Sequence, residues 1–317
     1  GLLFVPRAKR FDGNGSVFAM KKIVFSLAVL IAGALVWFFM PESVPVGERR
    51  ADGLYFGKMT TAQMKSAFKA QGYDMADVLE NKQPVPRLFV ESVPRDFNRP
   101  KYDEERPALF TEMLLPVIMK ANKTVLNERA EIERLSAKFA AKEAFSAEEL
   151  SWLEAEAQKY DIVFDAEDWD GSFRTMLLHV DGVPPSLLLA MAAEDSGFAT
   201  SRYAREYNSV FHARDWNGNG VVPDEPMTDG EDYRIVTYPT LYDAVLARIV
   251  WLNSGVRFSS FRDARQIYRQ GRSVLYGADT TGAFRLFPDR DFKYPDYLKH
   301  LILQYGWSPL DRAENPN

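Results

Sequence analysis

An uninterrupted apolar run at residues 23–40, IVFSLAVLIAGALVWFFM, constrains this chain more than any other feature. As a helix rising about 1.5 Å per residue, the run would extend about 27 Å, enough to cross the hydrocarbon core of a bilayer. Lys21 and Lys22 directly precede it, and Trp37 lies near its far end. Because basic flanks remain cytoplasmic, the pattern predicts a single-pass anchor in the inner membrane, with the C-terminal body in the periplasm.

A cleaved signal peptide is the alternative interpretation of this run. Ala32, Gly33 and Ala34 fit the small-residue cleavage pattern, although cleavage after Ala34 would leave a strongly apolar new terminus. Residues 1–22 form a basic cytoplasmic tail in the anchored interpretation. Within that tail, Met20 resembles a natural start, so we treat residues 1–19 as an upstream extension or added sequence and leave them out of the fold argument.

Charge and composition exclude several classes of function. The tail of residues 1–22 has a net charge of +4, so the remaining chain carries −9 of a total of −5. Such an acidic body argues against nucleic-acid binding, which requires clustered cations. The chain has no cysteine and three histidines, and it lacks a P-loop and a complete dinucleotide-binding fingerprint. We therefore expect no metal, no nucleotide and no other cofactor.

For the chain after residue 40, the sequence predicts a linker followed by a mostly helical α+β fold with a small β lobe. Residues 41–56 combine proline, glycine and charge without periodicity, which predicts a linker. The spacing of apolar residues predicts an N-terminal helical region at residues 57–160 and a second domain at residues 161–313. Further patterns predict these elements: helices at 60–80, 109–139 (kinked or restarted at Pro116), 146–158, 169–179, 184–195, 241–252, 261–269 and 294–305, extended chain at 88–90, and lobe strands at 221–222 and 233–238.

The stretch most suggestive of chemistry follows the helix that begins at Pro184. Glu194 and Asp195 end an apolar helix just before Ser196-Gly197. A carboxyl group there would be partly desolvated, which suits general-acid chemistry. Four aromatic residues follow and offer flat faces to sugar rings: Phe198, Tyr203, Tyr207 and Phe211. The plainer interpretation is that the acids cap a helix end while the aromatic side chains fill the core.

This stretch, PPSLLLAMAAEDSGFATSRYAREYNSVF at residues 184–211, resembles the Bax-like bacterial glucosaminidases, relatives of the glycoside hydrolase family 73 enzymes that cleave peptidoglycan. GNGVVP at 218–223 and WLNS at 251–254 resemble further motifs of that family, and similarity extends over roughly residues 56–313. The resemblance implies a lysozyme-like fold and cleavage of β-1,4 bonds beside N-acetylglucosamine in peptidoglycan glycan strands.

Two departures from the family pattern fall at its catalytic positions. Where the family has a catalytic glutamate this chain has Asp195, one methylene shorter, and the adjacent Glu194 projects about 100° away around the helix. Where the family has a tyrosine whose hydroxyl assists at the reacting sugar, this chain has Phe287. Phe198 replaces a tryptophan, Ala199 a glycine, and Asn208-Ser209 a pair of asparagines.

Glycoside hydrolysis also needs a second carboxylate or help from the acetamido group of the substrate. Acidic residues crowd the predicted β lobe, and Asp224 and Glu225 are candidates for the second acid, although a solvated acidic loop is the preferred interpretation for each residue taken alone. Asp215, Asn217 and Asn219 resemble the start of an EF-hand calcium loop, but Pro226 occupies the position of the bidentate glutamate. A plain turn is therefore the preferred interpretation.

Together these observations predict a membrane-anchored periplasmic endo-β-N-acetylglucosaminidase with Asp195 as general acid and Glu194 as its alternate. Tyr203, Tyr207, Asn208 and Phe211 would line the glycan cleft beside Phe198 and Phe287. The alternative is a catalytically degenerate glycan-binding or envelope interaction protein with the same fold, suggested by the loss of the glutamate and of the tyrosine hydroxyl. A structural envelope protein without glycan contact is the third hypothesis.

Overall fold

The computed structural model describes residues 45–224, 232–271, 273–285 and 292–313. Within these ranges no helix is both long enough and apolar enough to cross a membrane. The predicted span at residues 23–40 lies outside the described residues, as do Glu225 and Phe287.

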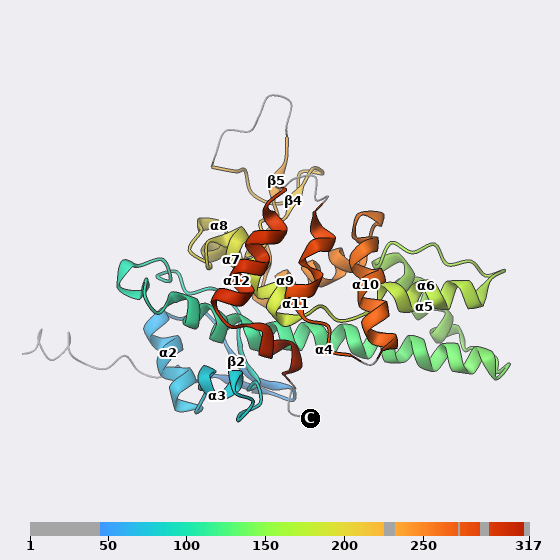
Figure 1. Ribbon diagram of the computed structural model, residues 1–317, viewed down its shortest axis with the longest axis horizontal. Helices are drawn as coiled ribbons and strands as arrows, with labels where there is room; N and C mark the ends of the chain where they lie inside the picture. Colours follow the sequence, from blue (N-terminus) through green and yellow to red (C-terminus); the bar gives the residue numbers. More distant parts are fainter. Residues whose placement is uncertain (1–44, 225–231, 272, 286–291, 314–317) are drawn as a thin grey trace, which may run out of the picture. The chain divides into compact units, whose positions relative to one another are not determined.

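The described chain is mostly helical (Figure 1). Its α-helices are α2 (Thr61–Ala70), α3 (Met75–Leu79), α4 (Arg106–Ala140), α5 (Ala147–Lys159), α6 (Trp169–His179), α7 (Pro185–Ser196), α8 (Arg202–Tyr207), α9 (Leu241–Asn253), α10 (Ser259–Gln270), α11 (Gly277–Thr280) and α12 (Tyr294–Gln304). Short 3₁₀ helices are η1 (Pro100–Tyr102), η2 (Val256–Phe258), η3 (Thr281–Phe284) and η4 (Ser308–Arg312). The strands are β1 (Glu48–Arg50), β2 (Gly53–Phe56), β3 (Leu88–Val90), β4 (Arg214–Asp215) and β5 (Arg234–Ile235). The predicted α+β class, mostly helical with a small β component, is confirmed.

The structure differs from the predicted linker at residues 41–56. Residues 48–56 form β1 and β2, which pair antiparallel, and β2 also pairs in parallel with β3. Tyr55 and Phe56 are buried by this pairing, which places Leu54 opposite Leu88. The charged, glycine-containing sequence conceals the strands because their partner lies more than 30 residues further along the chain. Burial of apolar side chains against β3 therefore overrides the weak local preference.

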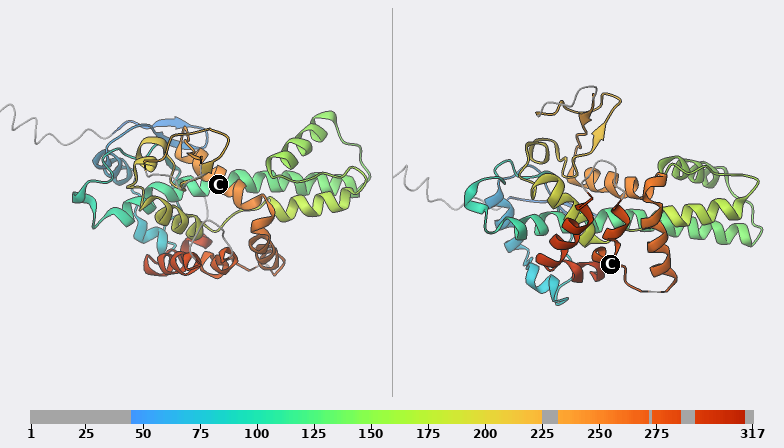
Figure 2. Two further views of the ribbon diagram at one scale, coloured as in Figure 1. Left: turned by 90° about the horizontal axis from the view of Figure 1, so that it is seen from above. Right: turned by 45° about the horizontal axis from the view of Figure 1, so that its top comes forward.

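Helix α4 runs without a break through Pro116, so the predicted restart at that residue does not occur. Its first half is buried on nearly every side, and α5 and α6 lie beside its C-terminal half (Figures 1 and 2). Glu128 joins these helices, since it accepts hydrogen bonds at 2.6 Å from both Lys159 and Tyr160. Ser146 opens α5 with the predicted capping box, in which it caps the backbone of Glu149 and the Glu149 side chain returns the bond.

Helix α7 occupies the centre of the fold. Every residue from Pro185 to Ala193 is buried, and α4, α11, α12 and η4 all pack against the helix. A helix that is apolar all round must be enclosed in this way. The described residues between 45 and 313 belong to one compact unit, which includes both regions predicted at 57–160 and 161–313.

A small lobe follows α8. Strands β4 and β5 pair antiparallel, and Val221 forms an isolated bridge with Ile235. The predicted strand at 221–222 is thus reduced to this single bridge, the predicted strand at 233–238 contains β5, and β4 was not predicted. Figure 1 shows these strands beyond α7 and α8. The lobe is therefore separated in sequence from the helix end that carries Asp195 by the short helix α8.

Candidate functional site

The C-terminal end of α7 is the candidate site. The helix stops at Gly197, whose φ of 58° is the left-handed conformation that glycine adopts at low cost. Phe198 (φ 54°) and Ala199 (φ 61°) continue in the same region, which is unfavourable for residues with a side chain. Strain of this kind persists only where the surroundings impose it, and it is frequent at functional sites.

Ser196 imposes this backbone path. Its buried hydroxyl donates to Ala192 O at 2.5 Å and accepts from the backbone N–H of Ala199 at 2.8 Å. Thr200 adds a hydrogen bond from its hydroxyl to Gly197 O at 2.7 Å. The Ser-Gly pair of the motif therefore has a physical purpose, because serine ties down the turn and glycine permits it.

The two acids at this helix end lie in different environments. The Asp195 side chain is only 1% exposed, and its Oδ2 lies 3.4 Å from Nη2 of Arg248 on α9. Glu194 is exposed. The predicted divergence of the two side chains is therefore observed, and only Asp195 points into the protein.

The predicted aromatic contacts divide into buried and partly buried groups. Phe211 is 2% exposed and lies in the core. Phe198 is partly buried in an aromatic cluster, with ring-centroid distances of 5.4 Å to Phe110, 5.2 Å to Tyr305 and 6.5 Å to Trp307. Both residues therefore support the α7 end from within the fold.

Helix α8 and its C-cap residue Asn208 supply three more of the predicted site residues. Tyr203 is buried, Tyr207 is half-buried, and the Arg202 guanidinium lies over both rings at 5.0 and 5.7 Å. Asn208 is 6% exposed; its Oδ1 accepts from Val93 N at 3.2 Å, and its Nδ2 donates to Tyr238 O and Pro239 O. The side-chain amide of Asn208 therefore makes its hydrogen bonds within the protein.

The lobe supplies Asp224, the described member of the predicted second-acid pair. Its carboxylate is bound at two points by Arg202, both at 2.6 Å, and remains 59% exposed. In the neighbouring turn, Asp215 Oδ1 accepts the backbone N–H groups of Asn217 and Asn219, as a plain turn requires. No group of three or more metal-ligating side chains occurs within the described ranges.

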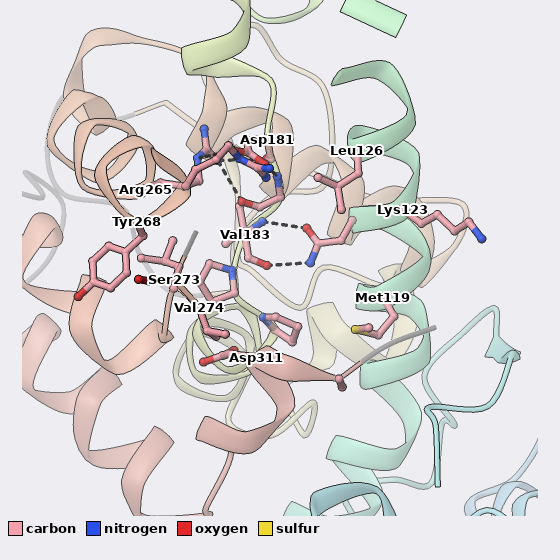
Figure 3. Close-up of a pocket in the computed structure, with 17 residues that line it drawn as sticks. Met119, Lys123, Leu126, Asp181, Val183, Arg265, Tyr268, Ser273, Val274 and Asp311 are labelled. Carbon is pink, nitrogen blue, oxygen red and sulfur yellow. Dashed lines mark hydrogen bonds and ion pairs between the residues drawn. The ribbon is translucent and has the colours of Figure 1, made fainter. Parts of the chain in front are cut away.

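A cavity of about 840 Å³ lies at the opposite end of α7 (Figure 3). Pro184 and Pro185 line it, so about ten residues, or roughly 15 Å of helix, separate it from Asp195. Met119 and Leu126 point from α4 into this space, whereas Lys123 points away. Asp311 closes another side, where it accepts hydrogen bonds from Ser186 N and Oγ at 2.9 and 2.7 Å.

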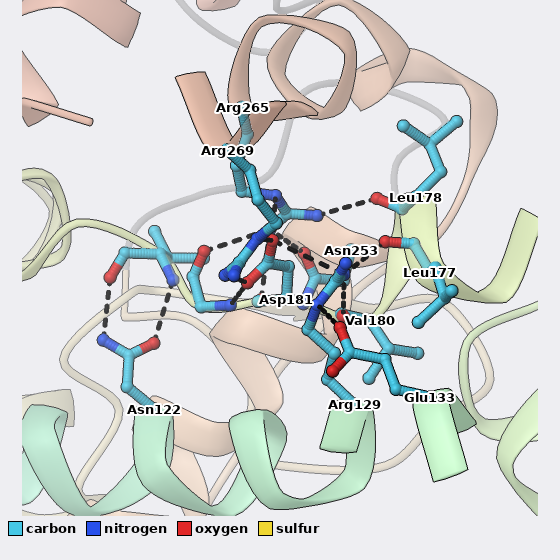
Figure 4. Close-up of polar contacts among 12 residues, drawn as sticks. Asn122, Arg129, Glu133, Leu177, Leu178, Val180, Asp181, Asn253, Arg265 and Arg269 are labelled. Carbon is cyan, nitrogen blue, oxygen red and sulfur yellow. Dashed lines mark hydrogen bonds and ion pairs between the residues drawn. The ribbon is translucent and has the colours of Figure 1, made fainter. Parts of the chain in front are cut away.

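Buried polar contacts hold the wall of this cavity in place (Figure 4). Asn122 bonds both the N–H and the carbonyl of Val183, at 2.9 and 2.7 Å. Asp181 is 3% exposed and is bound at two points by Arg269, with Arg129 and Arg265 at 3.5 and 3.9 Å. Burial lowers the pKa of Arg265 to about 10. These contacts hold the segment between α6 and α7 in place. They therefore fix the start of α7, the helix whose other end carries Asp195.

Comparison with known proteins identifies the domain that contains Asp195. Residues 175–306 match the model of the glucosaminidase family, described as mannosyl-glycoprotein endo-β-N-acetylglucosaminidase. This part of the chain is therefore similar to the glucosaminidase family. Protein bax of Escherichia coli (strain K12) is 24% identical over 193 residues, which cover 61% of this chain and 67% of that protein. No solved structure gives a significant match. The predicted resemblance to the Bax-like glucosaminidases is confirmed.

The matched glucosaminidase domain begins within α6 and ends just after α12, so it includes Asp195 and Arg248. Sequence reasoning missed Arg248 and the arginines around Asp181. One signal was present, because Arg248 is the single charged residue among the last ten residues of α9, AVLARIVWLN. A lone arginine on a buried face requires a partner, but the sequence does not indicate which acid provides it.

Proposed function

We propose that this protein is a peptidoglycan hydrolase that cleaves β-1,4 glycan bonds beside N-acetylglucosamine. The observation that carries the proposal is the inward-facing Asp195 carboxyl group at the end of α7, inside a glucosaminidase-family domain. Because α7 is rigid and buried, a carboxyl group on its last turn keeps the fixed position that acid–base chemistry requires. The family resemblance at residues 184–211 supports Asp195 as the reacting acid.

Other groups of the site would assist in binding and charge stabilisation. Asp224 is the described candidate for the second acid, and its exposure leaves it accessible to substrate. The acetamido group of the substrate is the other source of such help. Tyr207 on α8 is half-buried and adjoins Arg202, which holds Asp224, so its ring is the more accessible aromatic group near the lobe, whereas Tyr203 is buried.

We further propose that residues 23–40 anchor the protein in the inner membrane and place the body in the periplasm, next to its glycan substrate. The length of the apolar run and the two lysines before it support this topology. Protease treatment of intact spheroplasts tests it, since a periplasmic body is digested whereas a cytoplasmic one is protected.

The hydrolase proposal is tested with the purified full chain and isolated peptidoglycan sacculi. The wild type should release reducing ends, and a double variant with Asp195→Asn and Glu194→Gln should not. Equal release by the two proteins would show that neither Asp195 nor Glu194 takes part in the reaction. If neither protein releases reducing ends, hydrolysis is refuted.

A non-catalytic glycan-binding protein is the second candidate function. Two observations favour it: the Asp195 side chain is enclosed and paired with Arg248, and Phe287 lacks the hydroxyl of the family tyrosine. Sedimentation with sacculi without release of reducing ends would support binding alone. Activity gained by combining Asp195→Glu with Phe287→Tyr would show that only these groups were lost.

A further inference from the structure

Arg248 is a buried cation whose position is fixed by its surroundings. It lies on α9 and its side chain is only 8% exposed. Nη2 donates to the carbonyl oxygen of Phe211 at 2.5 Å, and the guanidinium lies 4.8 Å from the Phe211 ring and 4.6 Å from the Trp251 ring. A guanidinium held by a carbonyl group and two aromatic faces has little freedom to move.

The same Nη2 faces Asp195 at 3.4 Å. Because both side chains are nearly excluded from solvent, their attraction is much less screened than that of a surface pair. Burial raises the pKa of Tyr238, and the charge of Arg248 opposes that shift, so this phenol also lies within electrostatic reach of the guanidinium. Glu194, on α7 itself, points to solvent.

We propose that Arg248 is the positioning residue of the site: it fixes the Asp195 carboxyl group and holds it in the ionised form. An opposite charge at this range favours the charged state of a carboxyl group. The inference rests on the proposed function for its catalytic meaning, but the ion pair exists in the fold independently of turnover.

The ion pair refines the role expected from the sequence. During glycoside cleavage the leaving oxygen gains a proton while the sugar ring develops positive charge. A carboxylate held by Arg248 is suited to stabilise that positive charge and is poorly suited to donate the proton. We therefore assign to Asp195 the role of the anion that stabilises the developing positive charge of the sugar ring.

A titration of the Asp195 carboxyl group tests the proposal without any need for activity. The full chain is labelled with ¹³C-carboxyl aspartate, and the Asp195 signal is assigned as the one lost in Asp195→Asn. We expect this signal to titrate at least about one pH unit higher in Arg248→Met than in the wild type, with Arg248→Lys in between. Identical titration of the wild type and Arg248→Met would overturn the proposal.

Arg262→Met is the matched control. Arg262 is equally buried, on α10, but binds the backbone carbonyls of Ser254 and Gly255 and not Asp195. The Arg262→Met variant should unfold at a lower temperature than the wild type, while its Asp195 titration remains unchanged. A shift in this control as large as that in Arg248→Met would show that general loosening, and not the ion pair, sets the charge of Asp195.

An activated aryl β-N-acetylglucosaminide provides the catalytic readout, because its leaving group needs no proton. If Asp195 acts as an anion, Asp195→Asn should lose activity on this substrate as well as on sacculi. Retention of the aryl activity would identify Asp195 as the proton donor and overturn its assigned role. A wild type inactive on both substrates would refute the hydrolase proposal while leaving the ¹³C titration as an independent test of Arg248.

Discussion

Asp224 of the β lobe and Arg202 of α8 form a two-point ion pair, with both nitrogen–oxygen distances at 2.6 Å. The backbone N–H of Asp224 also donates to the Tyr203 hydroxyl at 2.5 Å. These contacts connect the lobe to the helix that follows the α7 turn. The candidate second acid is thus held by the same helix that carries the predicted glycan contacts Tyr203 and Tyr207.

Arg202→Gln should loosen the lobe without unfolding the protein. The pair is solvent-exposed, so global stability should change little, but the lobe loses its two-point attachment. Hydrogen exchange should become faster at residues 213–224 and remain unchanged in α4. Arg257→Gln, at an exposed arginine in η2, is the matched control. Unchanged exchange in the lobe of Arg202→Gln would mean that other contacts hold it.

The substitution Asn208→Ala should lower the stability of the fold and should not remove a contact with the glycan. The substitution leaves one buried N–H and two carbonyl groups without their partner and places alanine at a φ of 55°. We expect a loss of about 3 kcal/mol in the free energy of unfolding by denaturant titration. Asn127→Ala, at an exposed position of α4, should have almost no effect. Normal stability together with lost sacculus binding would instead assign Asn208 to the glycan cleft.

Glu112 on α4 should make stability fall with rising pH. Burial, reinforced by the charge of Asp74, raises the pKa of Glu112 to about 7 from an ordinary value of 4.5. The folded state therefore retains a proton that the unfolded chain has released, so stability declines between about pH 4.5 and 7. Glu112→Gln should be more stable than the wild type at pH 8, by on the order of 2 kcal/mol, and similar to it at pH 4.5.

The control for Glu112 is Glu104→Gln, at an exposed glutamate. This variant should follow the wild-type pH dependence throughout. A constant difference between Glu112→Gln and the wild type at all pH values would show that Glu112 acts through packing and not through ionisation.

Asp181→Asn should destabilise the protein strongly. Asp181 is the carboxylate that faces Arg129, Arg265 and Arg269, and its removal takes away the acidic partner of the buried Arg265. We expect a loss of about 3 kcal/mol or more. Arg269→Gln should cost less, because the Arg269 side chain is 46% exposed and can be replaced by water. Equal losses in the two variants would contradict this account of the cluster.

The sequence predicted elements whose signals are local. The helix at 169–179 has the predicted bounds, and the Ser146 capping box and the apolar helix from Pro184 are also as expected. These features depend on periodicity, capping and proline position over a few neighbouring residues. The burial of α7 followed in the same way from its continuous apolar composition.

Features that depend on distant partners were not predictable. Strand β2 exists because Leu54 pairs with Leu88, and the environment of Asp195 depends on Arg248, 53 residues away. Asn208 and Phe211 were predicted to line a cleft, yet both side chains are buried within the fold. Composition shows that an asparagine or an aromatic residue can bind a sugar, but only packing decides whether its side chain is available.

The most direct test of the central claim is the identity of the new reducing ends. Sacculi are incubated with the full chain, reduced with borohydride and hydrolysed, and the resulting amino sugar alcohols are separated. Cleavage beside N-acetylglucosamine predicts glucosaminitol that appears with time and is absent with Asp195→Asn. Muramitol in its place, or no sugar alcohol above the untreated sacculi, would contradict the glucosaminidase assignment.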